Sequence, residues 1–162
     1  MILYGPGYVK ALGEADDMAS LVDIMPTVAE LADVEIPKNY EFDGRNMMPF
    51  VSGKAPKHRD WIYSYNAEYQ IVRTRNVCRD GMGFYWDTRS TRDQEQYRLI
   101  NENRPDPSLR KDIELIRTIL KKYPAAPLSG PMYERYMKAK KGKRELWDKM
   151  REKILNQHKE GI

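Results

Sequence analysis

A short-period alternation of aromatic and polar positions in the middle of the chain predicts a small β-sheet. Every second residue of Trp61–Asn66 is a tryptophan or tyrosine, which is typical of a strand with one aromatic face. Tyr69–Arg75 is rich in β-forming residues, and a tight turn at Ala67–Glu68 would join the two strands as an antiparallel hairpin. Phe84–Trp86 follows a glycine-rich breaker and predicts a third strand. We therefore expect an antiparallel sheet of three to four strands, which needs a covering layer to be stable in water.

A helical period after the sheet supplies that layer. Asp106 is a good N-cap and Pro107 suits the first helical position. Lysines at the end of the pattern suit the helix dipole, and Pro124 stops the helix. We expect this amphipathic helix to pack across the sheet through apolar residues spaced by four, three and four positions, which are Leu109, Ile113, Ile116 and Leu120.

Two shorter helices are predicted before the sheet, and both begin with a polar residue, two apolar residues and a proline. Asp23 and Asn46 are the N-cap candidates, because their side-chain oxygens can accept hydrogen bonds from free amides of the first turn. Pro26 and Pro49 then fall where a missing N–H does no harm. The first helix is expected to lay one face on a core, through Ile24, Val28, Leu31 and Ala32.

The predicted fold class is therefore α+β, with two short capped helices, a small antiparallel sheet, a covering helix and a helical basic tail. We place one unit at residues 1–124 and a linker with a basic helical extension at residues 125–162. In the extension, apolar residues recur at helical spacing: Tyr133, Tyr136, Met137, Leu146, Trp147, Met150 and Ile154. The strongest positive run of the chain, Lys138–Arg144, lies between the two halves of this pattern.

Composition narrows the class of protein. The 162 residues are 41% hydrophobic and 32% charged, with a net charge of +4, which indicates a modest core and much solvated surface. The positive excess sits mainly in one C-terminal run, so a nucleic-acid partner is disfavoured. No run is long and apolar enough to span a bilayer. The N-terminus lacks the basic start and apolar core of a signal peptide, and the localisation stays open.

Few residues offer chemistry at a recognisable spacing. His58 and His158 have no neighbours at the spacing of zinc ligands. The single cysteine, Cys78, is read as a small hydrophobe in or near a strand, with a reactive or metal-bound role as the alternative. A carboxylate pair for acid–base catalysis could be sought among Asp87, Asp93 and Glu95. Because arginines crowd these carboxylates, we interpret them as members of solvated ion pairs.

Four segments in a fixed order resemble one family. They are "YGPGYVK" at 4–10, "SLVDIMPTVAELADVEIP" at 20–37 followed by "FDGRNMMPFVSGK" at 42–54, "YQIVRTRN" at 69–76 and "FYWDTRSTRDQEQYRLI" at 84–100. Together they resemble the part of sulfatases that follows the catalytic core, in the alkaline-phosphatase-like superfamily, and the resemblance covers Ile2–Tyr123. One departure is Asp33, where the family usually has glycine after the helix. We expect a looser helix end there, since glycine takes a left-handed C-cap at less cost than aspartate.

The resemblance implies an enzyme whose chemistry lies outside these residues. Sulfatases hydrolyse sulfuric esters with a formylglycine made from cysteine in a Cys-x-Pro-x-Arg motif, and with a calcium ion held by upstream segments. Cys78 has no proline two residues on, and the family's late catalytic lysine aligns just before Met1. The resemblance therefore implies no catalytic or metal-binding residue in this chain. Calcium and formylglycine would belong to the complete enzyme.

The resulting hypothesis is a C-terminal sulfatase subdomain, inactive alone, that supports a missing catalytic domain encoded by the same gene or by a separate chain. It would also shape the substrate pocket. Arg45 and Arg73 are the residues we expect to contact a sulfated substrate, because a guanidinium forks well onto sulfate. Two alternatives stay open. One is a non-enzymatic polyanion-binding or interaction module built on the basic tail, and the other is a remnant of a split or truncated gene.

Overall fold

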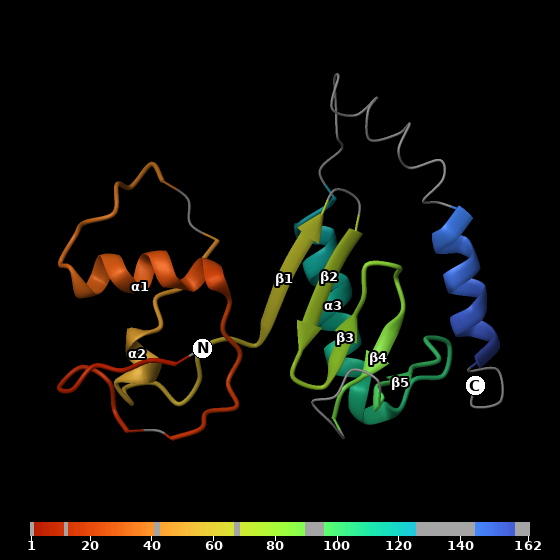
Figure 1. The fold of residues 1–162 in the computed structure, drawn as a ribbon, viewed down its shortest axis with the longest axis horizontal. Helices are drawn as coiled ribbons and strands as arrows, with labels where there is room; N and C mark the ends of the chain where they lie inside the picture. The colour runs from red at the N-terminus through yellow and green to blue at the C-terminus, as the bar shows by residue number, and fades with distance from the viewer. Residues whose placement is uncertain are drawn as a thin grey trace. The chain divides into compact units, whose positions relative to one another are not determined.

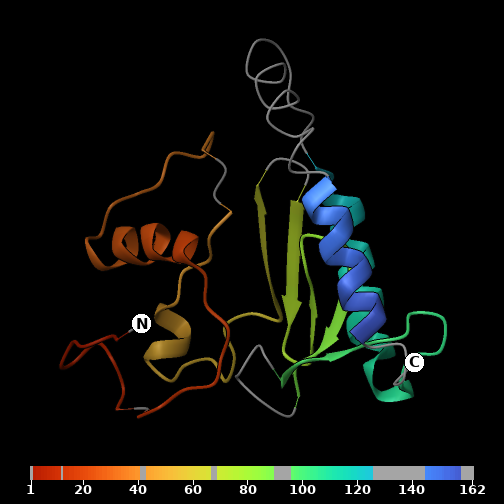
Figure 2. The ribbon, with the colours of Figure 1, turned by 45° about the vertical axis from the view of Figure 1, so that its right-hand side comes forward.

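The computed structural model describes residues 2–11, 13–40, 43–66, 69–89, 96–125 and 145–157. The chain forms two compact units, Met1–Ile62 and Tyr63–Ile162, and each is described by itself. The first unit contains the short helices and the second contains the sheet with its covering helix (Figures 1 and 2). This division falls within the region that the sequence predicts as one unit, residues 1–124. The predicted turn at Ala67–Glu68 lies outside the described residues.

The first unit begins with a turn and two short helices. Gly5 O accepts hydrogen bonds from Tyr8 N and Val9 N at 3.1 and 2.9 Å. The 3-10 helix η1 (Leu21–Asp23) runs directly into α1 (Ile24–Leu31), and α2 (Met48–Val51) follows after a long connection. The Lys10 N–H donates to Val51 O at 2.8 Å, so the N-terminal segment is anchored to the end of α2.

The buried face of α1 differs from the predicted one. Pro26 and Thr27 are buried, whereas Ile24, Val28 and Leu31 are exposed to between 42% and 54%. The prediction that the apolar positions face a core was therefore wrong within this unit. The side that contains Thr27 faces inward, because Thr27 and Asp23 of η1 accept hydrogen bonds from the chain that leads into α2. The apolar residues consequently form an exposed stripe: Leu21, Ile24, Met25, Val28 and Leu31.

The end of α1 takes the left-handed conformation that the sequence suggested. Asp33 has φ 52° and is the sole residue other than glycine with positive φ in the described part of the chain. The Asp33 N–H donates to Glu30 O at 3.2 Å and the Val34 N–H donates to Ala29 O at 2.9 Å. This pair of bonds is a Schellman motif, which closes the helix even without glycine.

The sheet of the second unit has five strands in the order β1-β2-β3-β4-β5. They are β1 (Trp61–Asn66), β2 (Tyr69–Thr74), β3 (Val77–Arg79), β4 (Tyr85–Asp87) and β5 (Arg98–Leu99). The pairings from β2 to β5 are antiparallel, with Arg73 opposite Cys78, Cys78 opposite Trp86 and Trp86 opposite Leu99. The antiparallel sheet is confirmed, but it is wider than predicted. The two strands that the sequence pattern did not predict, β3 and β5, are only three and two residues long.

One face of the sheet is covered by α3 (Arg110–Lys122), which continues from η3 (Pro107–Leu109) and packs on β2 and β3. Asp106 caps this element as predicted, since its side chain accepts from Ser108 N at 2.9 Å. The core lies between the helix and the strands and contains Leu109, Ile113, Ile116, Val72 and Val77, all at most 2% exposed. Ile119 is also buried, whereas Leu120, which was predicted to face the core, is half-buried.

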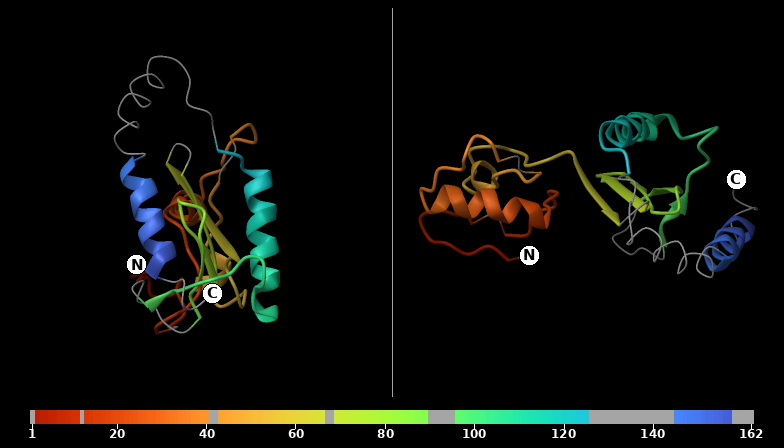
Figure 3. Two further views of the ribbon diagram at one scale, coloured as in Figure 1. Left: turned by 90° about the vertical axis from the view of Figure 1, so that its right-hand side faces the viewer. Right: turned by 90° about the horizontal axis from the view of Figure 1, so that it is seen from above.

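The opposite face of the sheet is approached by a helix over residues 145–157 (Figure 3). Trp147 stacks on Tyr69 with ring centroids 5.1 Å apart, and the Arg151 guanidinium lies 5.2 Å from the Phe84 ring centroid. This helix confirms the second half of the predicted helical pattern. The first half, with Tyr133, and the basic run Lys138–Arg144 lie outside the described residues. Among the helices described, none has the length and apolarity needed to cross a membrane.

Candidate functional site

Among the described residues of the first unit, Asp23 has the most side-chain hydrogen-bond contacts. Its side chain is 0% exposed and both carboxylate oxygens are occupied. Oδ1 accepts from Arg45 N at 2.8 Å and from the Arg59 guanidinium. Oδ2 accepts from Ser20 N at 2.8 Å and lies 3.0 Å from His58 Nε2. Four donors fill the acceptor capacity of a carboxylate, so Asp23 joins three separate segments rather than capping the amides of α1 as the sequence predicted.

Thr27, one helical turn after Asp23, extends this connection. Its hydroxyl donates to Asp23 O at 2.6 Å and accepts from Met47 N at 2.9 Å. Asp23 and Thr27 therefore hold the alternate N–H groups of Arg45 and Met47, and we call this arrangement the Asp23 clasp. Asn46 lies between them, and its Oδ1 accepts from Met48 N at 2.8 Å. It therefore bonds an amide of the first turn of α2 as predicted, although the N-cap position itself is Met47.

Gly44 allows the backbone that leads into the Asp23 clasp to pass close to Val22. A Cβ at this position would lie 1.9 Å from Val22 O and 2.5 Å from Val22 C, which are backbone atoms that cannot swing away. Val22 belongs to η1, so the backbone of Gly44 approaches the start of the first helical segment at a position that has no room for a side chain.

His58 and Arg59 close the clasp from the other side. Their side chains are 4% and 5% exposed, and the His58 N–H donates to Asp17 Oδ2 at 2.6 Å. The Nε atom of Arg59 is buried without a hydrogen-bond partner among the described residues. A buried guanidinium in contact with a buried carboxylate is typical of an ion pair that fixes a conformation.

The charges of this cluster alter two pKa values. Burial opposes ionisation of Asp23, but the N–H groups of Arg45 and Ser20, His58 and the Arg59 charge together lower its pKa below the ordinary 3.8. Burial also lowers the pKa of Arg59, against the attraction of Asp23, and the charge of Arg45 acts in the same direction as burial. Asp23 is thus held as an anion at neutral pH, and its role is structural.

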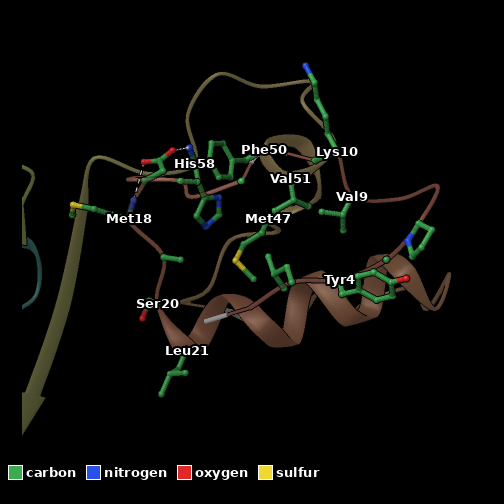
Figure 4. Close-up of a pocket in the computed structure, with 18 residues that line it drawn as sticks. Tyr4, Val9, Lys10, Met18, Ser20, Leu21, Met47, Phe50, Val51 and His58 are labelled. Carbon is green, nitrogen blue, oxygen red and sulfur yellow. Dashed lines mark hydrogen bonds between the residues drawn. The ribbon is translucent and has the colours of Figure 1, made fainter.

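A pocket of about 790 Å³ lies beside the clasp (Figure 4). Its lining is mainly apolar and includes Val9, Met47, Phe50 and Val51. Asp17 is the one carboxylate among the described lining residues, and it accepts from the backbone N–H groups of Met18 and His58. The volume falls in the range of small-molecule sites, but the carboxylate is committed to holding the backbone rather than to acid–base chemistry.

The two arginines predicted to bind substrate lie in different units. Arg45 is exposed, and its guanidinium lies 5.9 Å from the Trp61 ring centroid. Arg73 is half-buried on β2, and its Nη1 donates to the Tyr97 hydroxyl at 2.9 Å. No described carboxylate forms an ion pair with either guanidinium. The role of both residues at a substrate stays a prediction.

Cys78 is a half-buried thiol whose surroundings disfavour the thiolate. It lies in β3, and burial raises its pKa above the ordinary value even though the charge of Arg73 opposes this. Arg79 and Asp80 follow it, so a formylglycine motif does not fit here. Among the described residues no group of three His, Cys, Asp or Glu side chains converges as metal ligands do.

The carboxylates considered for acid–base chemistry are partly described. Asp87 pairs with Arg89 at 2.7 Å, and Arg89 also bonds Asp106 at 3.0 Å and the Ser108 hydroxyl at 2.6 Å. Bonds from Ser108 and Arg89 lower the pKa of Asp106 to about 2. The predicted ion pairing of Asp87 is confirmed, and the network joins β4 to the start of α3. Asp93 and Glu95 lie outside the described residues.

Comparison with curated proteins places these elements in context. Over 83 residues the chain is 37% identical to mouse steryl-sulfatase, a stretch that makes up 50% of this chain and 12% of the relative. This chain is similar to sulfatases over about half of its length. Over 77 residues it is 41% identical to mouse arylsulfatase G, covering 45% of this chain and 15% of the relative. Over 74 residues it is 36% identical to human steryl-sulfatase, covering 44% and 13% respectively.

The chain therefore spans only 12% to 15% of the length of these sulfatases. No protein-family model matches it. The resemblance inferred from four sequence segments is confirmed as a partial similarity over about half of the chain.

Sequence reasoning missed the residues that complete the clasp. It recognised Asp23 as polar and well placed, but it gave no role to Thr27, His58 or Arg59. His58 and Arg59 follow Asp23 by 35 and 36 positions, and no periodic pattern joins residues so far apart. One local signal was available, because Asp23 and Thr27 are four residues apart and therefore share one helix face.

Proposed function

We propose that this chain is the C-terminal subdomain of a sulfatase-type sulfuric ester hydrolase, and that it is inactive without a catalytic domain. The observation that carries the proposal is the similarity of half the chain to a short part of steryl-sulfatase and arylsulfatase G. The missing domain would come from the same gene or from a separate chain.

The proposed contribution is mechanical. The Asp23 clasp fixes α1 against the segment that leads into α2, and this leaves one side of the helix without cover in its own unit. Leu21 is 82% exposed, Met25 62% and Val28 54%. A row of large apolar side chains in water is typical of a surface that another protein surface covers. We assign that surface to contact with the catalytic domain.

The cofactors of the complete enzyme would belong to its catalytic part. Cys78 does not fit a formylglycine precursor, and the described carboxylates do not converge on a calcium site. Calcium would supply charge stabilisation at the sulfate group when bound there. In this chain, Arg73 is the best candidate for a sulfate contact, because its half-buried guanidinium has no described carboxylate partner and can fork onto an oxyanion. Arg45, which is exposed but also has no described carboxylate partner, is the second candidate.

The first test is enzymatic. The purified chain should show no turnover of an aryl sulfate, with or without calcium, because no nucleophile is proposed within it. Turnover that copurifies with the chain and is abolished by substitution of one of its own residues would refute the proposal.

The second test is a transplant. The 77-residue stretch of mouse arylsulfatase G that matches this chain is replaced by the corresponding residues of this chain. We expect a soluble enzyme that retains measurable sulfatase activity. The exchanged residues are chosen to include 20–59, and the same transplant with Asp23→Asn is the matched control, which should lose yield and activity together because it lacks the buried anion. An insoluble or inactive transplant whose parent is active would count against a shared structural role.

A further inference from the structure

The pocket beside the Asp23 clasp has no part in the proposed function. Its volume of about 790 Å³ is within the range of small-molecule sites, and its described lining residues all belong to the first unit. Apolar side chains such as Val9, Met47 and Val51 make up most of the wall. The few polar groups of the lining therefore decide which class of ligand the pocket accepts.

His58 presents an unpaired nitrogen to this pocket. Its side chain lines the pocket and is only 4% exposed. Nε2 lies 3.0 Å from Asp23 Oδ2, whereas Nδ1 makes no hydrogen bond to a described residue. In the described part of the chain, Arg59 Nε is the sole buried side-chain nitrogen or oxygen without a partner. Nδ1 therefore borders open space, and the open space beside this ring is the pocket.

The clasp fixes the hydrogen-bonding character of that nitrogen. Asp23 is held as an anion, so Nε2 carries the proton of the bond between the two side chains. In the neutral imidazole Nδ1 is then an acceptor. The ring is held in place at both ends, because Nε2 faces Asp23 and the His58 backbone N–H donates to Asp17 Oδ2 at 2.6 Å. A ligand that fills this apolar pocket must therefore offer a donor to Nδ1 or leave the acceptor unpaired, which costs free energy.

The charges of the lining disfavour an anionic ligand. Asp17 places a carboxylate next to His58, and its oxygens accept from the Met18 and His58 N–H groups at 2.9 and 2.6 Å. Among the described lining residues, Lys10 has the one ammonium group, and its side chain extends away from His58 (Figure 4). A negative ligand group at Nδ1 would therefore meet a like charge without a neighbouring ammonium group to offset it.

An aromatic wall beside His58 favours a flat ligand. The Phe50 ring lines the same pocket, with its centroid 6.5 Å from that of the His58 ring and an interplanar angle of 35°. Aromatic rings pack well on other flat apolar groups. Shape, charge and the acceptor at Nδ1 thus point to one kind of molecule.

We propose that this pocket binds a neutral, flat, apolar molecule whose single hydrogen-bond donor is directed at His58 Nδ1. A heteroaromatic compound with one N–H group, such as an indole, has this chemistry. The inference goes beyond the proposed function, because a sulfuric ester is an anion and lies outside this ligand class.

The test measures binding to the full chain by titration calorimetry with indole, 1-methylindole and phenyl sulfate. Indole should bind roughly three- to tenfold more tightly than 1-methylindole, which keeps the flat body but has no N–H, because this ratio corresponds to one hydrogen bond between neutral groups. Phenyl sulfate should bind more weakly than either. The ¹⁵N resonance of His58 Nδ1 should shift when indole is added and stay in place with 1-methylindole.

A pair of variants locates the ligand. Phe50→Leu should weaken both indoles by a similar factor, because it removes the aromatic wall and keeps the acceptor. Tyr40→Leu is the matched control, since Tyr40 is a 64% exposed aromatic residue of the same unit that does not line the pocket. It should change both affinities less than twofold.

Three results would overturn the proposal. Equal affinities for the two indoles, or an unshifted Nδ1 resonance with indole bound, would remove His58 from the site. Tighter binding of phenyl sulfate than of indole would exclude the neutral ligand class. No measurable binding of indole at its solubility limit would exclude the site itself. These assays measure binding without turnover, so their failure is distinct from a failed arylsulfatase transplant.

Discussion

Replacing Asp23 by asparagine should break the first unit. Asparagine keeps the size of the side chain but offers one acceptor oxygen, so part of the donor set loses its partner. The buried guanidinium of Arg59 also loses its counter-charge. Breaking a buried ion pair on one side costs about 3–5 kcal/mol, and a unit of this size has a total stability of roughly 3–9 kcal/mol. The substitution therefore removes a large share of the unit's stability.

Amide hydrogen exchange measures this loss where it occurs. The Arg45 and Met47 amides donate to the clasp, so their exchange reports on its opening. A loss of 3–5 kcal/mol corresponds to exchange that is faster by roughly 10² to 10³ or more, since each 1.4 kcal/mol is a factor of ten. The Ile116 amide in α3 belongs to the other unit and should keep its protection.

Two variants rank the causes. Asp60→Asn makes the same chemical change at an exposed carboxylate. Asp60 pairs with Lys57, and their side chains are 63% and 55% exposed. Such surface pairs contribute about 0–1 kcal/mol to stability. Arg59→Met removes the cation but leaves Asp23 with three donors, so its effect should be intermediate. The reasoning that the buried carboxylate holds this unit together would be refuted by one result. This is equal exchange protection of the Arg45 and Met47 amides in Asp23→Asn and in Asp60→Asn.

Three further predictions use the same structure. The pKa of Asp23 is lowered in the folded chain. The contribution of Asp23 to stability is therefore present above the unfolded pKa near 3.8 and is lost as the pH falls below about 4. A ¹³C titration of Asp23 with a midpoint above 4 would contradict this. Asp33→Gly should raise the free energy of unfolding by about 0.5–1 kcal/mol, because glycine removes the cost of the left-handed conformation. Gly53→Ala should lower it, because Gly53 has φ 77° after α2. Changes of the same sign for both variants in urea unfolding would refute the account. Met25→Lys with Val28→Lys should reduce self-association of the isolated chain, since both residues belong to the exposed stripe; sedimentation velocity that shows the same association in both proteins would exclude this stripe as the contact.

The helical period predicted α3 and its cap because one face of that helix lies on a sheet in the same unit. Ile116 is 0% exposed, and the pattern pointed to it directly. The same rule failed for α1, where the apolar residues are exposed and Thr27 is buried. A periodic pattern identifies the apolar face of a helix, but it cannot tell whether the surface that packs on this face belongs to the same chain.

The strands show a similar limit. Trp61–Asn66 and Tyr69–Thr74 are long enough for their alternation to be visible in the sequence. Val77–Arg79 and Arg98–Leu99 are three and two residues long, too short for any period. They are strands because a neighbouring strand pairs with them. The clasp was hidden for a related reason, since its contacts join segments that are distant in sequence.

Gly44 has a consequence for how this chain tolerates changes in length. Its backbone lies close to Val22 of η1, and the clasp holds Arg45 and Met47 just after it, so the return of the chain after the helix is fixed within Gly44–Met47. The connection between Val34 and Asp43 starts at the end of α1 and leads to Gly44. Doubling the length of such a loop costs only about 0.6 kcal/mol in closure entropy. Insertions should therefore be accepted between these two anchors, which makes the connection a suitable place for an epitope or a fluorophore tag.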